Sequence, residues 1–101
     1  MAKFVQRYEL SPEADSDLEE LFDYTDQEFG LEQAVEYVSG FDIVFDQLIK
    51  NPELGKMRKD IRKGLRSLVH KKHVIFYRIL NDRIRIVRIL HGSRDVYKFF
   101  A

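Results

Sequence analysis

Two long stretches of the chain repeat apolar residues at steps of three and four, which is the period of an amphipathic helix. The first begins at Ser11-Pro12, where a serine N-cap precedes a proline at the first helical position, and ends at Gly30. The second begins at Leu31 and ends at Asn51, because the following proline disfavours helical geometry there. The pattern predicts an antiparallel helical hairpin. The expected buried stripes are Ala14, Leu18, Leu21, Phe22, Thr25 and Phe29, and then Ala34, Tyr37, Val38, Phe41, Val44, Phe45 and Leu48.

The remaining apolar residues alternate with polar ones, as in strands. Such segments cover residues 4–10, 65–70, 73–80 and 83–90, with Lys71-Lys72 and Asn81-Asp82 as tight connections. Residues 56–63 are densely basic and are expected to form a loop. The sequence thus predicts one α+β domain over residues 1–101, in the order β-α-α-β-β-β, with the hairpin packed on one face of an antiparallel sheet.

A two-residue turn at Asn81-Asp82 would pair positions whose numbers sum to 163, and this register predicts two faces for the last hairpin. The face expected under the helices holds Ile79, Ile84, Tyr77, Ile86, Ile75, Arg88, His73 and Leu90. The other face holds Leu80, Arg83, Arg78, Arg85, Phe76, Val87, Val74 and Ile89. It would leave Val74, Phe76, Val87 and Ile89 as an apolar patch, which commonly marks a partner surface. The alternative is that the C-terminal tail, or the first strand and its flanking loop, covers the patch.

Charge divides the 101 residues into unlike halves although the formal net charge is zero. Residues 1–55 hold three Lys and Arg against fourteen Asp and Glu, a net charge of −11, and residues 56–101 hold fourteen against three, a net charge of +11. Either acidic helices neutralise a basic sheet, or the basic half faces a polyanion or an acidic protein. With no cysteine and no long apolar run, we expect a soluble cytoplasmic protein without a membrane segment.

Few residues suggest chemistry. The three histidines are widely spaced and differ in setting, and phosphate-loop, serine-elbow and HExxH patterns are absent, so neither a metal nor a cofactor is expected. The segment from His91 to Tyr97 does concentrate groups that can transfer protons or stabilise phosphate charge. The alternative, which we favour, is that His91 ends the last strand while Arg94 and Asp95 pair locally.

Several segments in this order resemble the RelE/ParE superfamily of toxins, and more closely its ParE branch. They are Leu10-Ser11-Pro12-Glu13-Ala14, Asp17-Leu18-Glu19, Phe29-Gly30, Asn51-Pro52-Glu53-Leu54-Gly55, Arg62 to Arg66, Val74-Ile75-Phe76-Tyr77-Arg78, Val87-Arg88-Ile89-Leu90-His91 and Arg94-Asp95. The resemblance covers nearly the whole chain. It implies a type II toxin that inhibits DNA gyrase through the A subunit and blocks replication, without catalysis, and that a ParD-like antitoxin neutralises.

The predicted apolar patch and the basic second half of the chain supply candidate residues for these two partners. For antitoxin binding these are Val74, Phe76, Val87 and Ile89, and for target binding they are Arg62, Arg78, Arg83, Arg85 and Arg94. The alternative from the RelE branch is ribosome-dependent mRNA cleavage, whose roles would fall on Arg66, Arg78 and His91 or Tyr97. A general nucleic-acid binder is the weakest hypothesis, because the fourteen acids of the first half repel phosphate, and no sequence-specific nucleic-acid binding is expected.

Overall fold

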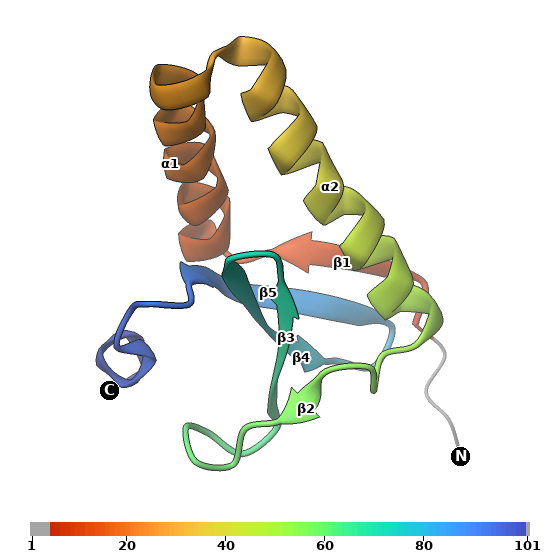
Figure 1. Ribbon diagram of the computed structural model, residues 1–101. Coiled ribbons are helices and arrows are strands. Elements are labelled where there is room, and N and C mark those ends of the chain that lie inside the picture. The colour runs from red at the N-terminus through yellow and green to blue at the C-terminus, as the bar shows by residue number, and fades with distance from the viewer. Residues whose placement is uncertain (1–4, 101) are drawn as a thin grey trace.

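The computed structural model describes residues 5–100, which form a helical hairpin over a five-stranded sheet (Figure 1). The elements are β1 (Arg7–Leu10), α1 (Pro12–Phe29), α2 (Leu31–Lys50), β2 (Lys56–Met57), β3 (Leu65–His70), β4 (His73–Ile79), β5 (Arg83–His91) and the short 3-10 helix η1 (Val96–Phe99). The strand order is β1-β5-β4-β3-β2. The α+β fold and the hairpin on one face are confirmed, but the sheet is mixed because β1 runs parallel to β5.

The strands differ from the prediction at two places. The expected basic loop contains β2, whose two residues pair with Arg66 and Ser67 of β3. A backbone hydrogen bond from Arg58 to Leu65 (2.8 Å) continues this pairing. The first strand begins at Arg7, and the predicted start at Phe4 lies outside the described residues.

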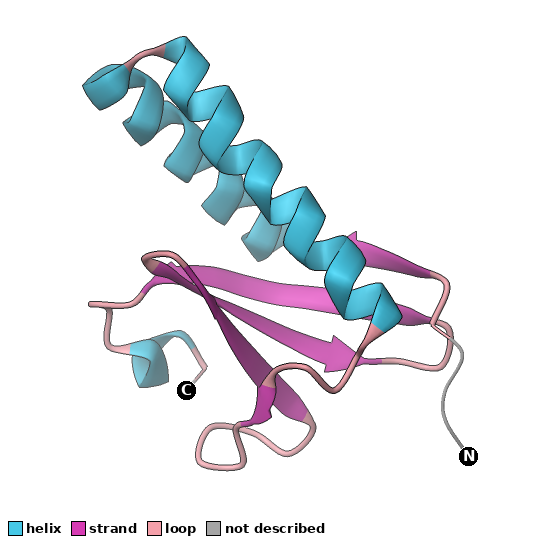
Figure 2. Cartoon of the chain, turned by 45° about the vertical axis from the view of Figure 1, so that its right-hand side comes forward, coloured by secondary structure: helices cyan, strands magenta, loops and turns pink. Residues whose placement is uncertain are grey.

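The hairpin begins and turns where the sequence predicts. The Ser11 hydroxyl accepts a hydrogen bond from the backbone N–H of Ala14 (2.9 Å), as an N-cap does. Gly30 joins the helices with φ of +96°, a conformation that glycine adopts without steric cost. Only the base of the hairpin lies against the sheet, and its tip projects beyond it (Figure 2). Phe29, predicted to be buried, is therefore 68% exposed at this tip. Neither described helix is long and apolar enough to cross a membrane.

The main core lies between the hairpin and the sheet. Phe41, Phe45 and Leu48 of α2 pack there against side chains from β4 and β5, namely Ile75, Tyr77, Ile84 and Ile86. All seven side chains are fully buried. The Tyr77 hydroxyl donates to the Pro52 carbonyl (2.7 Å) and accepts from the Gly55 N–H (2.8 Å), which fixes the segment that follows α2.

A β-bulge changes the register between β4 and β5. Paired positions sum to 163 from Ile79 to Tyr77, as predicted, but to 164 from Phe76 to His73, so that Val87 is an extra residue in β5. The start of α1 holds this bulge, because the Ser11 hydroxyl donates to the Val87 carbonyl (2.7 Å) and the Ser11 N–H donates to the Ile86 carbonyl (2.9 Å).

The bulge makes part of the predicted face assignment wrong. Ile89 packs in the main core beneath the hairpin, although it was assigned to the open face. Leu90 makes the opposite change and packs on the far side of the sheet. Arg88, also expected under the helices, now pairs with Phe76 and lies beside the C-terminal segment.

The expected open apolar patch does not exist in this structure. The far side of the sheet carries a second core built on Phe76, Leu65 and Leu90, which the C-terminal segment and the 56–63 loop cover. Phe76 is fully buried, and its ring lies 5.0 Å from that of Phe100, centroid to centroid. Coverage by the tail, the alternative reading of the sequence, is therefore confirmed. The other residues of this second core are Ile61, Val74, Val87, Val96 and Phe99.

Candidate binding surfaces

The four predicted antitoxin-binding residues do not share one exposed surface. Val74 and Val87 are partly buried in the second core, Phe76 is fully buried there, and Ile89 lies on the opposite side of the sheet. The geometric premise of one open patch was wrong, since the bulge and the tail were not visible in the sequence. Contact of an antitoxin with Val74 or Val87 remains a prediction, and it would require residues 96–100 to move aside.

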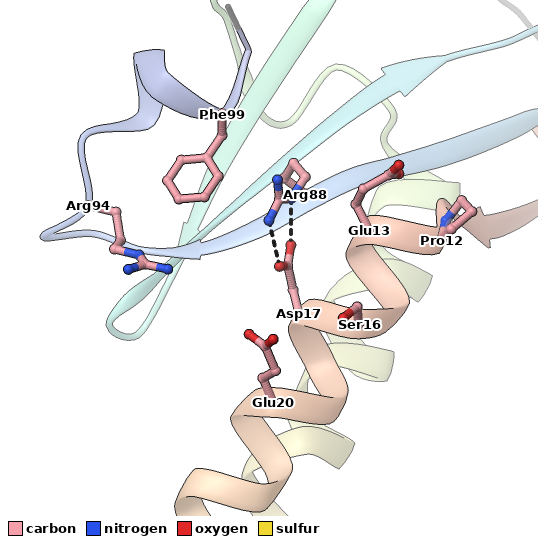
Figure 3. Close-up of a pocket in the computed structure, with 8 residues that line it drawn as sticks. All are labelled: Pro12, Glu13, Ser16, Asp17, Glu20, Arg88, Arg94 and Phe99. Carbon is pink, nitrogen blue, oxygen red and sulfur yellow. Dashed lines mark hydrogen bonds and ion pairs between the residues drawn. The ribbon is translucent and has the colours of Figure 1, made fainter.

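An open pocket of about 440 Å³ lies between the first turns of α1, β5 and the C-terminal segment (Figure 3). At its centre Asp17 and Arg88 face each other in a bidentate ion pair, with distances of 2.9 Å from Nε to Oδ2 and 2.8 Å from Nη2 to Oδ1. Asp17 also accepts the backbone N–H of Ile89 (2.9 Å). The hydrogen bonds that Arg88 donates to this carboxylate raise the pKa of Arg88. The pocket is lined by Pro12, Glu13, Ser16, Asp17, Glu20, Arg88, Arg94 and Phe99.

Contacts between arginine side chains and an aromatic ring stabilise the pocket. The guanidinium groups of Arg88 and Arg94 lie 4.8 and 5.2 Å from the centroid of the Phe99 ring, in cation–π contacts. Glu13 and Glu20 form no ion pair with another residue of the range 5–100. The pocket therefore joins the tail to α1 and keeps two carboxylates available. No group of three His, Asp or Glu side chains in the described part of the chain is arranged to hold a metal ion.

The predicted target-binding arginines separate into two groups. Arg62 and Arg94 contact residues 96–100, which we call the C-terminal cover. Arg62 donates to the Phe100 carbonyl (3.0 Å), and Arg94 contacts the Phe99 ring. The others gather on the sheet face opposite the hairpin, near the β4–β5 turn, because Arg78 pairs with Arg85 across the strands. Parallel pairing of β1 with β5 adds Arg7 beside Arg83, a neighbour that no local pattern in the sequence could reveal. We call Arg7, Arg78, Arg83 and Arg85 the arginine corner.

The four residues considered for mRNA cleavage are not brought together. Arg66 pairs with Tyr77 and so faces the hairpin side, whereas Arg78, next along β4, faces the other side. His91 lies six residues along β5 from the partner of Arg78, about 20 Å away. The Tyr97 hydroxyl donates to Asp60 (2.8 Å), which raises the pKa of the tyrosine, while Arg58 is the main cause that lowers the pKa of Asp60 to about 2. These contacts tie Tyr97 to the loop.

The three histidines meet at one end of the sheet, which the sequence spacing did not suggest. His73 pairs with His70 on one side and, through the bulge, with His91 on the other. Its Nδ1 lies 3.0 Å from the Tyr37 hydroxyl, and the rings of His73 and His91 are 5.4 Å apart. The Nε2 atom of His70 is buried and has no hydrogen-bond partner among residues 5–100. Burial, followed by nearby positive groups, lowers the pKa of both His70 and His73.

The amino-acid sequence is similar to those of known proteins. Residues 8–96 match the family described as the ParE toxin of the type II toxin-antitoxin system parDE. A curated Toxin ParE1 from Mycobacterium tuberculosis is 38% identical over 91 residues, which cover 89% of this chain and 93% of the relative. Toxin ParE1 from Caulobacter vibrioides is 34% identical over 88 residues, covering 87% and 91%.

A solved structure shows the same fold. A chain of the chromosomal ParDE toxin-antitoxin system from P. aeruginosa superposes with a TM-score of 0.75 at 21% identity, covering 87% of this chain and 96% of that one. The family match extends from β1 to Val96, the first residue of η1, and so includes the hairpin and the bulge. The chain belongs to the ParE toxin family of type II toxin-antitoxin systems.

Proposed function

We propose that this ParE-family chain inhibits DNA gyrase by binding its A subunit, without catalysis, and that a ParD-like antitoxin neutralises it. The observation that carries the proposal is the family match over residues 8–96, together with two toxins more than 30% identical. The similar chain from P. aeruginosa belongs to a system named ParDE, which supports an antitoxin of the ParD type for this chain.

The arrangement of side chains supports a binding role over RNA cleavage. Nucleophilic or acid-base chemistry needs its groups within hydrogen-bond reach of one reacting atom. Arg66 and Arg78 face opposite sides of the sheet, and the hydroxyl of Tyr97 is hydrogen-bonded to Asp60. The molecule offers instead separate charged surfaces, an acidic hairpin and a basic corner, which suit recognition of a large partner.

A supercoiling assay tests the gyrase proposal. Purified chain added to gyrase, ATP and relaxed plasmid should block supercoiling or leave linear, cleaved DNA. Relaxation of supercoiled plasmid by topoisomerase I, run in parallel, controls for nonspecific effects on DNA. Unimpaired supercoiling at a clear molar excess of the chain would reject the proposal, and cleavage of end-labelled message in a cell-free translation reaction would favour the RNase alternative.

Hydrogen exchange of the amides in the C-terminal cover tests where the antitoxin binds. If a ParD-like segment reaches Val74 and Val87, residues 96–100 must leave the second core, and their amides should exchange hydrogen faster in the complex than in the free toxin. Exchange of α2 amides near Phe41, in the main core, serves as the internal reference. Slower exchange throughout residues 96–100 would show that the antitoxin binds over the cover and that Val74 and Val87 are not its contacts.

A further inference from the structure

The arginine corner carries more positive charge than its surroundings neutralise. Glu9 binds Arg83 (2.7 Å) and also Arg85, and Asp82 binds Arg7 (2.9 Å) and Arg83 (3.0 Å). Hydrogen bonds from these arginines lower the pKa of both carboxylates, so both are ionised at neutral pH. Four guanidinium groups against two carboxylates leave a net charge of +2 on three adjacent strands.

Arg78 is the member of the corner that the fold leaves unpaired. It is exposed, and its side chain forms no hydrogen bond or ion pair with any residue between positions 5 and 100. It lies directly opposite Arg85, and like charges at opposed cross-strand positions destabilise a sheet. Its guanidinium lies beside Gly64, where a side-chain carbon would be 3.4 Å from Nη2 of Arg78. The position adds positive potential without stabilising the sheet.

The acidic residues that argue against nucleic-acid binding lie elsewhere on the molecule. Twelve of the fourteen carboxylates in residues 1–55 belong to α1 and α2. The hairpin lies on one face of the sheet, and its tip projects beyond the sheet (Figure 2). The strand register places the arginine corner on the other face. A polyanion that approaches the corner therefore meets positive potential first.

We infer that the arginine corner binds the phosphate backbone of double-stranded DNA without sequence preference, and that Arg78 supplies the principal contact. Guanidinium groups pair with phosphate oxygens in a bidentate manner, and the corner spans β1, β5 and β4, about 10 Å, which is wide enough for more than one phosphate. The choice of DNA over an acidic peptide rests on the proposed function, because a toxin docked on gyrase lies beside the duplex that this enzyme handles.

Fluorescence anisotropy with a short, labelled, mixed-sequence duplex and the isolated chain tests the inference. Binding should weaken with salt, and the logarithm of the association constant should fall against the logarithm of salt concentration with a slope of about −2. Arg78→Gln should weaken binding and reduce the magnitude of this slope by about 1. Lys72→Gln removes the same charge from an exposed position at the other end of β4 and should leave the slope unchanged.

Three results would overturn the inference: no duplex binding at low salt, an equal loss in both variants, or displacement by polyglutamate at lower concentration than by unlabelled duplex. The last result would assign the corner to an acidic protein. Since gyrase is absent from this assay, the two proposals fail separately. Duplex binding with normal supercoiling would reject only gyrase inhibition, and inhibited supercoiling without duplex binding would reject only the DNA contact.

Discussion

Asp17 connects three parts of the chain through one carboxylate. It lies on the second turn of α1, forms two hydrogen bonds with Arg88 of β5 and accepts the N–H of Ile89 just after the bulge. Its side chain is only 10% exposed and that of Arg88 19%, so water contributes little to satisfying either group. Arg88 in turn contacts the Phe99 ring, which extends the link to the C-terminal cover.

Asp17→Ala should therefore lower the free energy of unfolding by about 2 kcal/mol, because it leaves a partly buried guanidinium unpaired and a backbone N–H without an acceptor. Urea denaturation followed by circular dichroism measures the change. Asp23→Ala, on the same helix but exposed and without an ion pair in the described residues, is the matched control and should change stability by less than about 0.5 kcal/mol. Equal effects of the two substitutions would contradict the connecting role of Asp17.

The limit of sequence-based prediction is clearest at Val87. Alternation of apolar and polar residues correctly predicts the pairing from Ile79 to Tyr77, where the turn fixes the register. The bulge depends on hydrogen bonds from Ser11, which is distant in sequence, so no local pattern marks it. One extra residue then moves Ile89, Leu90 and Arg88 to faces other than those predicted. The helix boundaries, by contrast, depend on the local signals at Ser11, Gly30 and Asn51 and were predicted correctly.

At the scale of elements, the C-terminal segment completes the second core. Residues 96–100 and the 56–63 loop pack over Phe76, and Arg58 and Arg62 stack on the Phe76 and Phe100 rings at 5.7 and 5.6 Å. The alternation of apolar and polar residues predicts that Phe76 points away from the hairpin, but it cannot predict which segment of the chain covers Phe76. Three of the four residues predicted for the patch, Val74, Phe76 and Val87, therefore do lie on one apolar surface, and that surface has an intramolecular partner.

Phe100→Ala tests this cover. Loss of the ring, which is 7% exposed, should cost about 3 kcal/mol of stability and expose Phe76 and Leu90 to water. The measurements are urea denaturation and the fluorescence of a hydrophobic dye that binds exposed apolar surface. Lys98→Ala, in the same segment but exposed, should leave both readings near those of the parent chain. A stable, dye-negative Phe100→Ala variant would show that the tail does not seal the sheet.

For the whole molecule, charge is separated and not neutralised across the fold. Of the ion pairs among residues 5–100, only Asp17 with Arg88 joins an acid of the hairpin to the sheet. The other acids of α1 and α2 leave a negative surface on one side, while the basic half forms the far side and its cover. Such a distribution orients the molecule as it approaches a charged partner.

The histidines at one end of the sheet should make the free energy of unfolding depend on pH below neutrality. Burial and nearby positive groups, including Lys71 beside His70 and His91 beside His73, hold the pKa of both side chains below 6.5 in the folded state, although Asp17 opposes the effect at His73. The unfolded chain then binds more protons than the folded chain, so the free energy of unfolding should fall as pH drops through about 6.5, with the loss complete below the folded pKa values. Urea denaturation between neutral and mildly acidic pH measures this slope. The double variant H70Q/H73Q should show a flatter dependence, whatever its stability at neutral pH, and a slope equal to that of the parent chain would mean that groups other than these two histidines take up the protons.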